Sequence, residues 1–263
     1  MRIESLLIYP IKSCGAVSLN STRVYEYGFE FDREWMLVDQ EGNFISQREY
    51  PVLNLIKVLQ VDHDQLQLEF QGQKVTFELR SEPLDTLVKV WSSECLANRE
   101  NPIASEFFSE LLQSKVSLVR IKRKSRLKKN EYLPKTIELN FPDGYPVHLV
   151  NQHSVEMVSS KAGDEIFPIQ FRPNILVKDL LPFEEDRLKM IKINSLEFTT
   201  IKTCVRCIMT TLKPMEAKFQ KEPLSTLSKF RKNNNNIEFG IYLLPRSENG
   251  PMTISTSDTI SYL

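Results

Sequence analysis

The sequence is poor in the residues that would assign it at once to several classes of protein. Its 263 residues include only four cysteines, too few for a disulfide framework in a chain of this length, so a reducing compartment fits best. It contains only three histidines. The formal net charge is zero, with 34 basic and 34 acidic side chains, so nothing in the overall charge points to nucleic acid.

Long hydrophobic runs are also missing. The N-terminal apolar stretch is interrupted by Glu4 and Pro10 and is too short for the core of a signal peptide. No other run approaches the length of a membrane span. We therefore predict a cytoplasmic protein that has neither a membrane nor a nucleic acid as a partner.

What the sequence does contain is an ordinary share of apolar residues, arranged in many short β-type runs. With 41% hydrophobic and 26% charged residues, the chain can build one large domain or two ordinary ones. In the first part, alternating apolar residues are separated by turns. The expected strands are 3–9, 18–24, 35–39, 44–46, 55–61, 65–70, 74–79 and 88–91. Their spacing predicts a β-barrel or a sandwich.

The second part of the chain mixes helices with strands. Asn101 suits a helix N-cap and Pro102 the first helical position, and apolar residues then recur at helical spacing. Further helices are expected from Asn151 or Ser154 to Lys161 and over 222–231. The expected strands are 116–121, 147–150, 174–177, 193–201, 208–212 and 241–244. We therefore predict an α+β, β-rich fold, with a β-barrel-like N-terminal domain over residues 1–95 and a second domain over residues 96–263.

The most informative motif is Cys204-Val205-Arg206-Cys207, which places two thiols three positions apart with an arginine between them. It follows the alternating stretch 196–201 and so lies at the end of an expected strand. A thiolate is a soft ligand for a soft metal, and a nearby guanidinium favours the thiolate and can bind an anion. The motif therefore predicts a site at a rigid strand end.

Three other interpretations of this cysteine pair stay open at this point. It could be half of a zinc site, although no second pair exists and no histidine has zinc-ligand spacing to it. It could be a thioredoxin-like redox centre, although the β-forming residues 208–212 follow where that motif would open a helix. Both cysteines could also be small buried hydrophobic residues.

Four further segments place cations, a hydroxyl and turn amides at the ends of expected strands. Each could form only local ion pairs, but together they resemble an anion site for a phosphate-bearing ligand. These segments are Tyr9-Pro10-Ile11-Lys12-Ser13-Cys14, Phe31-Asp32-Arg33-Glu34-Trp35, Asp143-Gly144-Tyr145-Pro146 and Phe171-Arg172-Pro173-Asn174.

With the cysteine motif and the segments 221–227 and 239–242, these sequences occur in an order that closely resembles the MOSC family. In particular, they resemble the branch that contains the mitochondrial amidoxime-reducing component and its bacterial relatives. The resemblance runs nearly from end to end. It implies an N-terminal MOSC β-barrel domain followed by a MOSC β-barrel domain with flanking helices.

The resemblance also implies a molybdenum–molybdopterin cofactor, with the metal held by the pterin dithiolene and by one protein thiolate. Cys207 inherits the position of that ligand, as metal-binding and catalytic residue, and Cys204 is then structural. The remaining positions are implied to hold the cofactor's phosphate and pterin or to line the site beside Cys207. They are Lys12, Ser13, Arg33, Gly144, Tyr145, Arg172, Val205, Arg206 and Tyr242.

The function implied is the reduction of small N-hydroxylated compounds, such as amidoximes, hydroxylamines or N-hydroxylated nucleobases. The alternatives are a carrier of the cofactor, or of sulfur as a persulfide on Cys207, and a member that has lost the metal. Asp143 and Tyr242 neighbour motif residues and are candidates for a general acid.

The sequence has no haem or iron–sulfur motif of its own, so we expect a separate ferredoxin- or cytochrome-like electron donor with its reductase. The basic run 120–129 is the densest charged segment. It is expected to be either a solvated loop or the docking patch for that donor.

Overall fold

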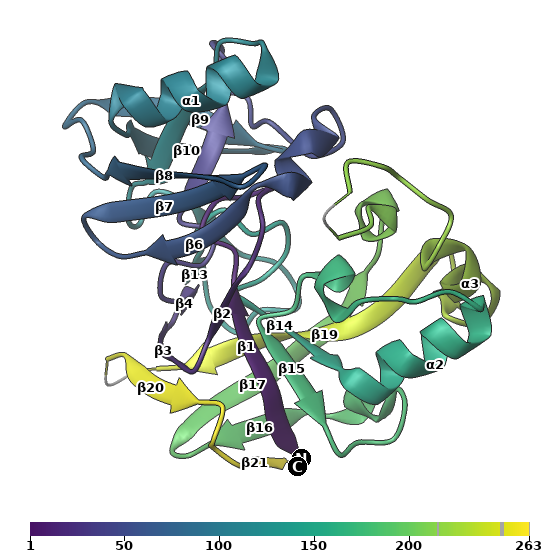
Figure 1. The fold of residues 1–263 in the computed structure, drawn as a ribbon. Helices are drawn as coiled ribbons and strands as arrows, with labels where there is room; N and C mark the ends of the chain where they lie inside the picture. Colours follow the sequence, from purple (N-terminus) through teal and green to yellow (C-terminus); the bar gives the residue numbers. More distant parts are fainter. Residues whose placement is uncertain (215, 248–249, 263) are drawn as a thin grey trace.

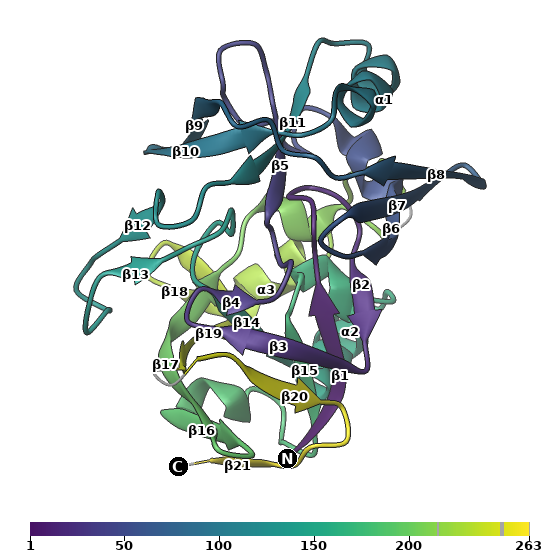
Figure 2. The same ribbon diagram turned by 90° about the vertical axis from the view of Figure 1, so that its left-hand side faces the viewer.

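A computed structural model describes residues 1–214, 216–247 and 250–262 of the chain. Figure 1 shows two lobes, with helix α1 (Pro102–Leu112) on the upper one and helices α2 (Gln152–Ala162) and α3 (Leu224–Phe230) beside the large sheet of the lower one. In Figure 2, the 90° turn shows the upper lobe as a set of small sheets stacked above the large one.

A nine-stranded sheet forms the lower lobe, and its strands come from both ends of the chain. The order is β2-β1-β15-β14-β19-β17-β16-β21, and β18 pairs with β19. β14 and β15 are parallel and joined by α2, whereas β1 runs antiparallel to β15, with Leu6 opposite Ile175. The strands are β1 (Arg2–Ile8), β2 (Val17–Leu19), β14 (Val147–Asn151), β15 (Ile175–Lys178), β16 (Met190–Ile193), β17 (Leu196–Val205), β18 (Lys232–Asn233), β19 (Asn236–Arg246) and β21 (Ile260–Tyr262).

Four smaller sheets complete the fold. They pair as β5-β11-β10-β9, β6-β7-β8, β20-β3-β4 and β12-β13. Their strands are β3 (Ser21–Tyr25), β4 (Gly28–Phe29), β5 (Trp35–Val38), β6 (Lys57–Val61), β7 (Gln65–Phe70), β8 (Gln73–Glu78), β9 (Asp85–Val90), β10 (Ser93–Arg99), β11 (Ser117–Ile121), β12 (Leu127–Lys128), β13 (Ile137–Glu138) and β20 (Met252–Ser255). Short 3-10 helices lie at η1 (Pro51–Leu55), η2 (Pro168–Phe171), η3 (Glu184–Arg187) and η4 (Ile208–Thr211).

Each lobe has its own apolar core. In the lower lobe, Leu6 of β1, Leu149 of β14 and Ile241 of β19 belong to one fully buried cluster. In the upper lobe, Trp35 of β5 and Phe108 of α1 are fully buried in another. Because β1 leads from the large sheet toward the upper lobe, the segment directly after it lies between the two cores (Figure 1).

The expected α+β, β-rich class is confirmed, and so are the three helices. The side chain of Asn101 caps α1 by accepting a hydrogen bond from the N–H of Ile103 at 3.0 Å, and Asn151 caps α2 in the same way through His153 at 3.1 Å. Among the described residues, no helix is long and apolar enough to cross a membrane.

Several expected strands have different bounds. The expected strand 18–24 is two strands in different sheets, and the expected strand 193–201 is a hairpin of β16 and β17. β10 follows the hairpin turn after β9, so residue 95, the proposed domain boundary, lies inside a strand. The division into 1–95 and 96–263 stays a prediction.

The expected strand 208–212 is wrong. Residues 208–211 form the 3-10 helix η4, in which the Thr210 hydroxyl donates to the carbonyl of Cys207 at 3.0 Å and the Thr211 hydroxyl to that of Ile208 at 2.8 Å, and Leu212 forms only an isolated bridge to Phe219. Threonine hydroxyls that bond to nearby carbonyls compete with strand pairing, and here they override the β-propensity of the segment.

Candidate functional site

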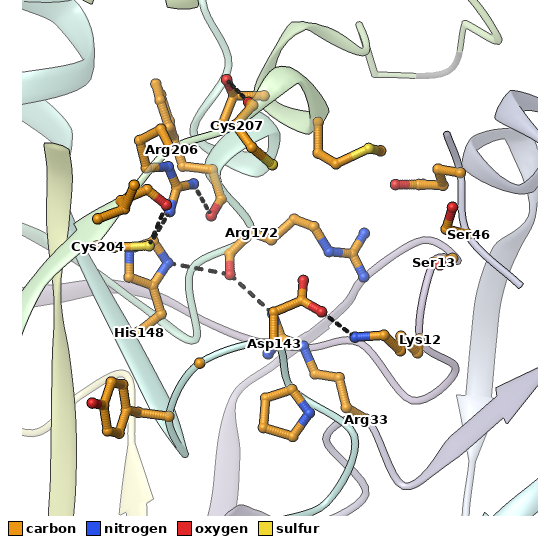
Figure 3. Close-up of a pocket in the computed structure, with 18 of the residues that line it drawn as sticks. Lys12, Ser13, Arg33, Ser46, Asp143, His148, Arg172, Cys204, Arg206 and Cys207 are labelled. Atoms are coloured by element: carbon orange, nitrogen blue, oxygen red, sulfur yellow. Dashed lines mark hydrogen bonds and ion pairs between the residues drawn. The ribbon is translucent and has the colours of Figure 1, made fainter. Parts of the chain in front are cut away.

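A cavity of about 230 Å³ lies between the two lobes and brings together every predicted site residue. The upper-lobe side of its wall comes from the segments around residues 12, 33, 44–48 and 91, and the rest comes from the lower lobe. All ten predicted positions line it: Lys12, Ser13, Arg33, Gly144, Tyr145, Arg172, Val205, Arg206, Cys207 and Tyr242. Figure 3 shows how the labelled members of this set point toward one another.

Cys207 is presented at the end of the long strand β17. The pairing of β17 with β19 is irregular between Thr203 and Val205, as in a β-bulge, and such irregularities redirect side chains near a strand end. Cys207 has extended backbone torsions and is the N-cap of η4. Of the four cysteines, it alone is exposed, and Val205 beside it is also exposed. Its thiol is therefore accessible from the cavity.

Cys204 lies at the buried side of the motif and holds Arg206 in place. One guanidinium nitrogen of Arg206 donates to the Cys204 sulfur at 2.6 Å, and the other donates to the carbonyl of Phe171 at 2.6 Å (Figure 3). The third nitrogen, Nε, is buried and has no hydrogen-bond partner among the described residues. Arg206 thus carries a charge and a spare donor at the site.

Lys12 reaches across from the upper lobe and binds the Asp143 segment. Its buried ammonium donates to the carbonyl of Phe141 at 2.9 Å and forms an ion pair with Asp143. Trp91 Nε1 donates to the same carboxylate at 2.9 Å. Burial lowers the pKa of Lys12, and the charge of Asp143 partly offsets this change.

The same contacts determine the protonation of Asp143. Desolvation by nearby protein atoms would raise its pKa, but the side chain is 65% exposed, and the charge and hydrogen bond of Lys12, helped by Trp91 and Arg33, hold that pKa well below its ordinary value. Asp143 is therefore a carboxylate, which argues against the expected role of this residue as a general acid. Burial raises the pKa of Tyr242 well above its ordinary value, and Cys204 adds to the shift, so the phenol keeps its proton.

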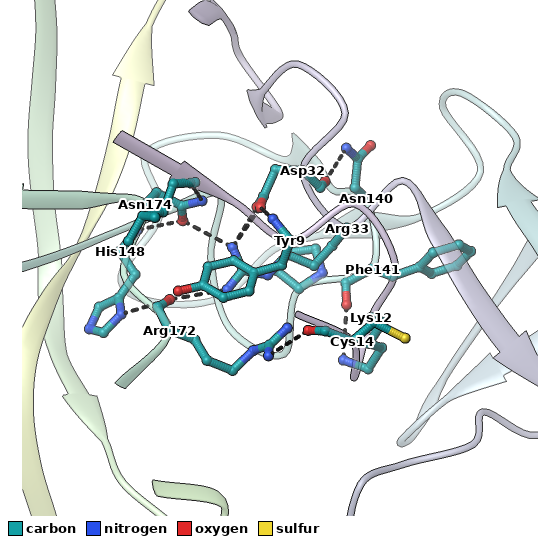
Figure 4. A network of polar contacts seen from close by, with 12 residues as sticks. Tyr9, Lys12, Cys14, Asp32, Arg33, Asn140, Phe141, His148, Arg172 and Asn174 are labelled. Carbon is teal, nitrogen blue, oxygen red and sulfur yellow. Dashed lines mark hydrogen bonds and ion pairs between the residues drawn. The ribbon is translucent and has the colours of Figure 1, made fainter. Parts of the chain in front are cut away.

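Two arginines from different lobes meet over one buried tyrosine ring (Figure 4). The guanidinium carbons of Arg33 and Arg172 lie 4.2 and 4.1 Å from the centroid of Tyr9. Arg33 also donates to Asp32 at 2.6 Å, whereas Arg172 donates to the carbonyl of Cys14 at 2.9 Å and pairs with no carboxylate among the described residues. Burial, with the nearby charge of Arg33, lowers the pKa of Arg172 to about 10.

Asn174 joins these parts together and was missed from the sequence. Its side-chain oxygen accepts from Arg33 and from the backbone N–H of His148, each at 3.1 Å, and its amide donates to the carbonyl of Leu7 at 3.1 Å. It belongs to the Phe-Arg-Pro-Asn segment that was singled out for Arg172 alone. A buried amide at a strand start was the available signal.

His148 was also missed, because it stands inside the apolar strand that follows the Asp-Gly-Tyr-Pro segment, where a lone histidine carries no motif of its own. Burial and the charge of Arg206 lower its pKa well below 6.5, so its ring is neutral. It lies against Tyr242, with ring centroids 5.5 Å apart. The cavity residues Phe44, Arg48 and Trp91 were missed too, since they meet only through tertiary contacts.

The basic run 120–129 is solvated in part: Lys122, Arg123, Lys124 and Lys129 are exposed, whereas Arg126 and Lys128 contact the segment 140–144 beside the cavity. Several of its charges pair within the chain: Arg120 and Arg123 with Glu34, and Lys122 with Asp85. Arg126 is only 6% exposed and donates to the carbonyls of Asn140 at 2.6 Å and Pro142 at 2.9 Å. Lys128 donates to the carbonyl of Gly144 at 2.9 Å. Two carboxylates, Glu34 and Asp85, thus pair with three of the seven cations of the run, and the exposed Lys124 and Lys129 form no ion pair among the described residues, so the docking patch stays a prediction.

The residues present suit an anionic ligand that carries a soft metal. Five cations line the cavity, at Lys12, Arg33, Arg48, Arg172 and Arg206, and Asp143 is the one carboxylate among the lining residues. A Cβ atom on Gly144 would lie 2.6 Å from the ring of Tyr242. Only glycine therefore lets the backbone at residue 144 approach this ring so closely. No three His, Cys, Asp or Glu side chains in the described ranges gather closely enough to hold a metal ion by themselves.

Both parts of the chain match domains of known protein families. Residues 1–115 match the MOSC N-terminal beta barrel domain, and residues 136–261 match the MOSC domain. The chain is 30% identical over 242 residues to mitochondrial amidoxime-reducing component 1 of Danio rerio, which covers 87% of this chain and 74% of that protein. It is also 30% identical over 252 residues to mitochondrial amidoxime reducing component 2 of Rattus norvegicus, covering 87% and 72%.

A second group of relatives is longer. The chain is 27% identical over 270 residues to the molybdenum cofactor sulfurase of Oryza sativa subsp. japonica, which covers 92% of this chain but 32% of that protein. The chain thus spans about a third of that relative. Since both domain types match in order and the amidoxime-reducing relatives align over most of their length, the chain belongs to the MOSC family.

Proposed function

We propose that this protein is a molybdenum cofactor-dependent reductase of small N-hydroxylated compounds, such as amidoximes, hydroxylamines or N-hydroxylated nucleobases. The observation that carries the proposal is the accessible thiol of Cys207 at a cavity lined with cations. A thiolate suits a soft metal, and the cations suit the phosphate of molybdopterin. The names of the amidoxime-reducing relatives support the reaction type.

Cys207 would supply the protein ligand to molybdenum. Lys12, Ser13, Arg33, Gly144, Tyr145 and Arg172 would hold the phosphate and pterin, and Val205, Arg206 and Tyr242 would line the site beside the thiol. When bound, the cofactor would supply the two-electron redox chemistry that cleaves an N–O bond.

The chain's own residues would orient the ligand and manage protons. Arg172 and Arg206 form no ion pair with a carboxylate among the described residues, and an anionic ligand would offset the repulsion between Arg172 and Arg33. Tyr242 keeps its proton and can donate a hydrogen bond, whereas the Asp143 carboxylate, held by Lys12 and Trp91, can only accept one.

The proposal is tested by replacing the thiol. In protein produced by a host that makes molybdopterin, Cys207→Ser should lose molybdenum and the reduction of benzamidoxime driven by a chemically reduced dye. Cys95→Ser is the matched control, because Cys95 is buried in the upper lobe away from the cavity. Cys204→Ser should mainly change stability. Full activity in Cys207→Ser would overturn the ligand assignment.

The alternative function is that of a carrier, either of the cofactor or of sulfur as a persulfide on Cys207. The name of the molybdenum cofactor sulfurase relative supports this alternative. The same assay separates the two functions. Wild-type protein that is fully loaded with molybdenum but fails to reduce either an amidoxime or a hydroxylamine would support the carrier.

A reductase would also need a separate electron donor, which we propose to be a ferredoxin- or cytochrome-like protein with its own reductase. Donor-driven rates should fall as salt rises if charge steers the encounter. The run 120–129 keeps exposed cations, among them Lys124 and Lys129, and stays the proposed docking surface.

A further inference from the structure

Trp91 occupies an unusual position for a large aromatic residue. It is the first residue of the two-residue turn between β9 and β10, where Val90 pairs with Ser93, and its φ of +56° lies in the left-handed region. Such turn positions normally take glycine or asparagine, and a bulky residue there is strained. Its side chain is nonetheless 49% exposed, so burial in a core does not explain its presence.

Contacts from two other segments, 44–48 and the one that carries Asp143, fix the indole at the rim of the cavity. Phe44 packs against it at an angle of 66°, with ring centroids 4.8 Å apart. The guanidinium carbon of Arg48 lies 4.9 Å from the ring centroid. The indole N–H donates to Asp143 at 2.9 Å. Because the ring is held in one orientation yet half exposed, its free surface is a preformed wall.

The guanidinium of Arg48 is free to bind a ligand at the rim of the cavity. It is exposed, lines the same cavity and forms no ion pair among the described residues. Its guanidinium is held mainly by the indole, and a contact of this kind is easily rearranged at an exposed site. It can therefore move aside and still donate hydrogen bonds to a group that packs on the ring.

We propose that Trp91, Phe44 and Arg48 form an aromatic platform that selects planar, conjugated N-hydroxylated substrates over saturated ones of the same size. The proposal rests on the proposed function, because it assigns the substrate class of that site. A flat π-system packs on tryptophan with more contact and a better geometry than a puckered ring does. The platform lies in the upper lobe, whereas Cys207 lies in the lower one, so a substrate would bridge the lobes.

The test uses two amidoximes that differ only in the ring. Benzamidoxime is flat and conjugated, whereas cyclohexanecarboxamidoxime has the same ring size but is saturated. Binding of each to molybdenum-loaded protein is measured by calorimetry, and reduction is measured as kcat/KM with a reduced dye. Trp91→Leu should weaken benzamidoxime binding about two- to tenfold, the worth of one aromatic contact, and change the saturated analogue less than twofold.

Two further variants make the result specific. Trp91→Phe should recover most of the preference, because it keeps an aromatic ring while removing the N–H that contacts Asp143. Leu87→Ala is the matched control, because Leu87 is an exposed apolar residue of the same hairpin that does not line the cavity, and its preference should equal that of the wild type.

Each remaining outcome decides the proposal. Equal losses for both amidoximes in Trp91→Leu, or no loss for either, would overturn the platform. A lower molybdenum and pterin content in Trp91→Leu with an unchanged preference would mean that Trp91 holds the cofactor instead. If the wild type binds neither compound, the platform is wrong. If it binds benzamidoxime preferentially but reduces neither, the platform stands and the proposed reductase function fails.

Discussion

Gly240 is the residue at which a single added methyl group should reveal how tightly β19 packs against β14, the strand that carries the cavity residue His148. It lies in β19 with a φ of +72°. A Cβ atom there would lie 2.6 Å from Nε2 of His148, 2.8 Å from the carbonyl oxygen of Leu149 and 2.9 Å from a methyl group of Val150. Two of these atoms belong to a buried ring and to the backbone, so they cannot move aside without shifting β14.

The magnitude follows from two separate costs. A left-handed backbone costs an alanine about 1–2 kcal/mol, and forcing a methyl group into a packed interior costs about 1–3 kcal/mol. Gly240→Ala should therefore lower the free energy of unfolding by about 2–5 kcal/mol, a large share of the stability of an ordinary protein. Because His148 lines the cavity, the folded fraction should also bind less pterin.

The assay is urea unfolding at equilibrium, with Gly72→Ala as the matched control. Gly72 has a φ of +82° in the turn between β7 and β8, and nothing lies within 4 Å of a Cβ built on it. It should show the backbone cost alone, so the difference between the two variants isolates the packing cost. If both variants lose the same stability to within about 0.5 kcal/mol, packing around Gly240 is looser than these distances indicate.

Two further predictions concern charge. Arg172→Gln should lower the fraction of protein that binds pterin, because it removes a cavity cation that pairs with no carboxylate among the described residues. The control Arg2→Gln breaks a surface ion pair with Asp179 and should leave that fraction unchanged. Normal pterin content in Arg172→Gln would contradict the anion-site assignment. Burial raises the pKa of Glu185 to about 7 from 4.5, so the folded chain keeps a proton that the unfolded chain releases, and stability should fall as the pH rises from about 4.5 to 7. Glu185→Gln should flatten this dependence and raise the free energy of unfolding at pH 8 by about 2–3 kcal/mol, measured by urea unfolding; no gain at pH 8 would refute the shift.

Features that depend on adjacent residues could be predicted from the sequence. The start of α1 is such a case, because the cap by Asn101 and the proline that follows are local. The strand expected over 208–212 failed for a related reason. Its residues do favour strands, but their hydroxyl groups find carbonyls three positions back, and the competition between two local preferences cannot be read from propensity alone.

The same distinction between local and tertiary features applies to the residues of the site. The ordered motifs predicted which residues would meet, and the cavity does contain Lys12, Arg172 and Cys207 together, although their roles stay proposals. Trp91 could not be found in this way, because its place depends on the register of a hairpin and on contacts from distant segments. The partners of the basic run, Glu34 and Asp85, are likewise set only by the fold.

The interleaving of the two chain ends in one sheet has a consequence for the time at which the protein can receive a ligand. β1 is synthesised before its partner strands, yet Leu6 pairs with Ile175, and the carbonyl of Met1 accepts the N–H of Ile260. Lys12, which follows β1, cannot take its place opposite Asp143 until that sheet begins to assemble, and Tyr242 is added later still. A partly made chain therefore has no cavity to load, and contacts this distant in sequence close slowly. Any anionic ligand held between the lobes must therefore enter after β19, which carries Tyr242, has been synthesised.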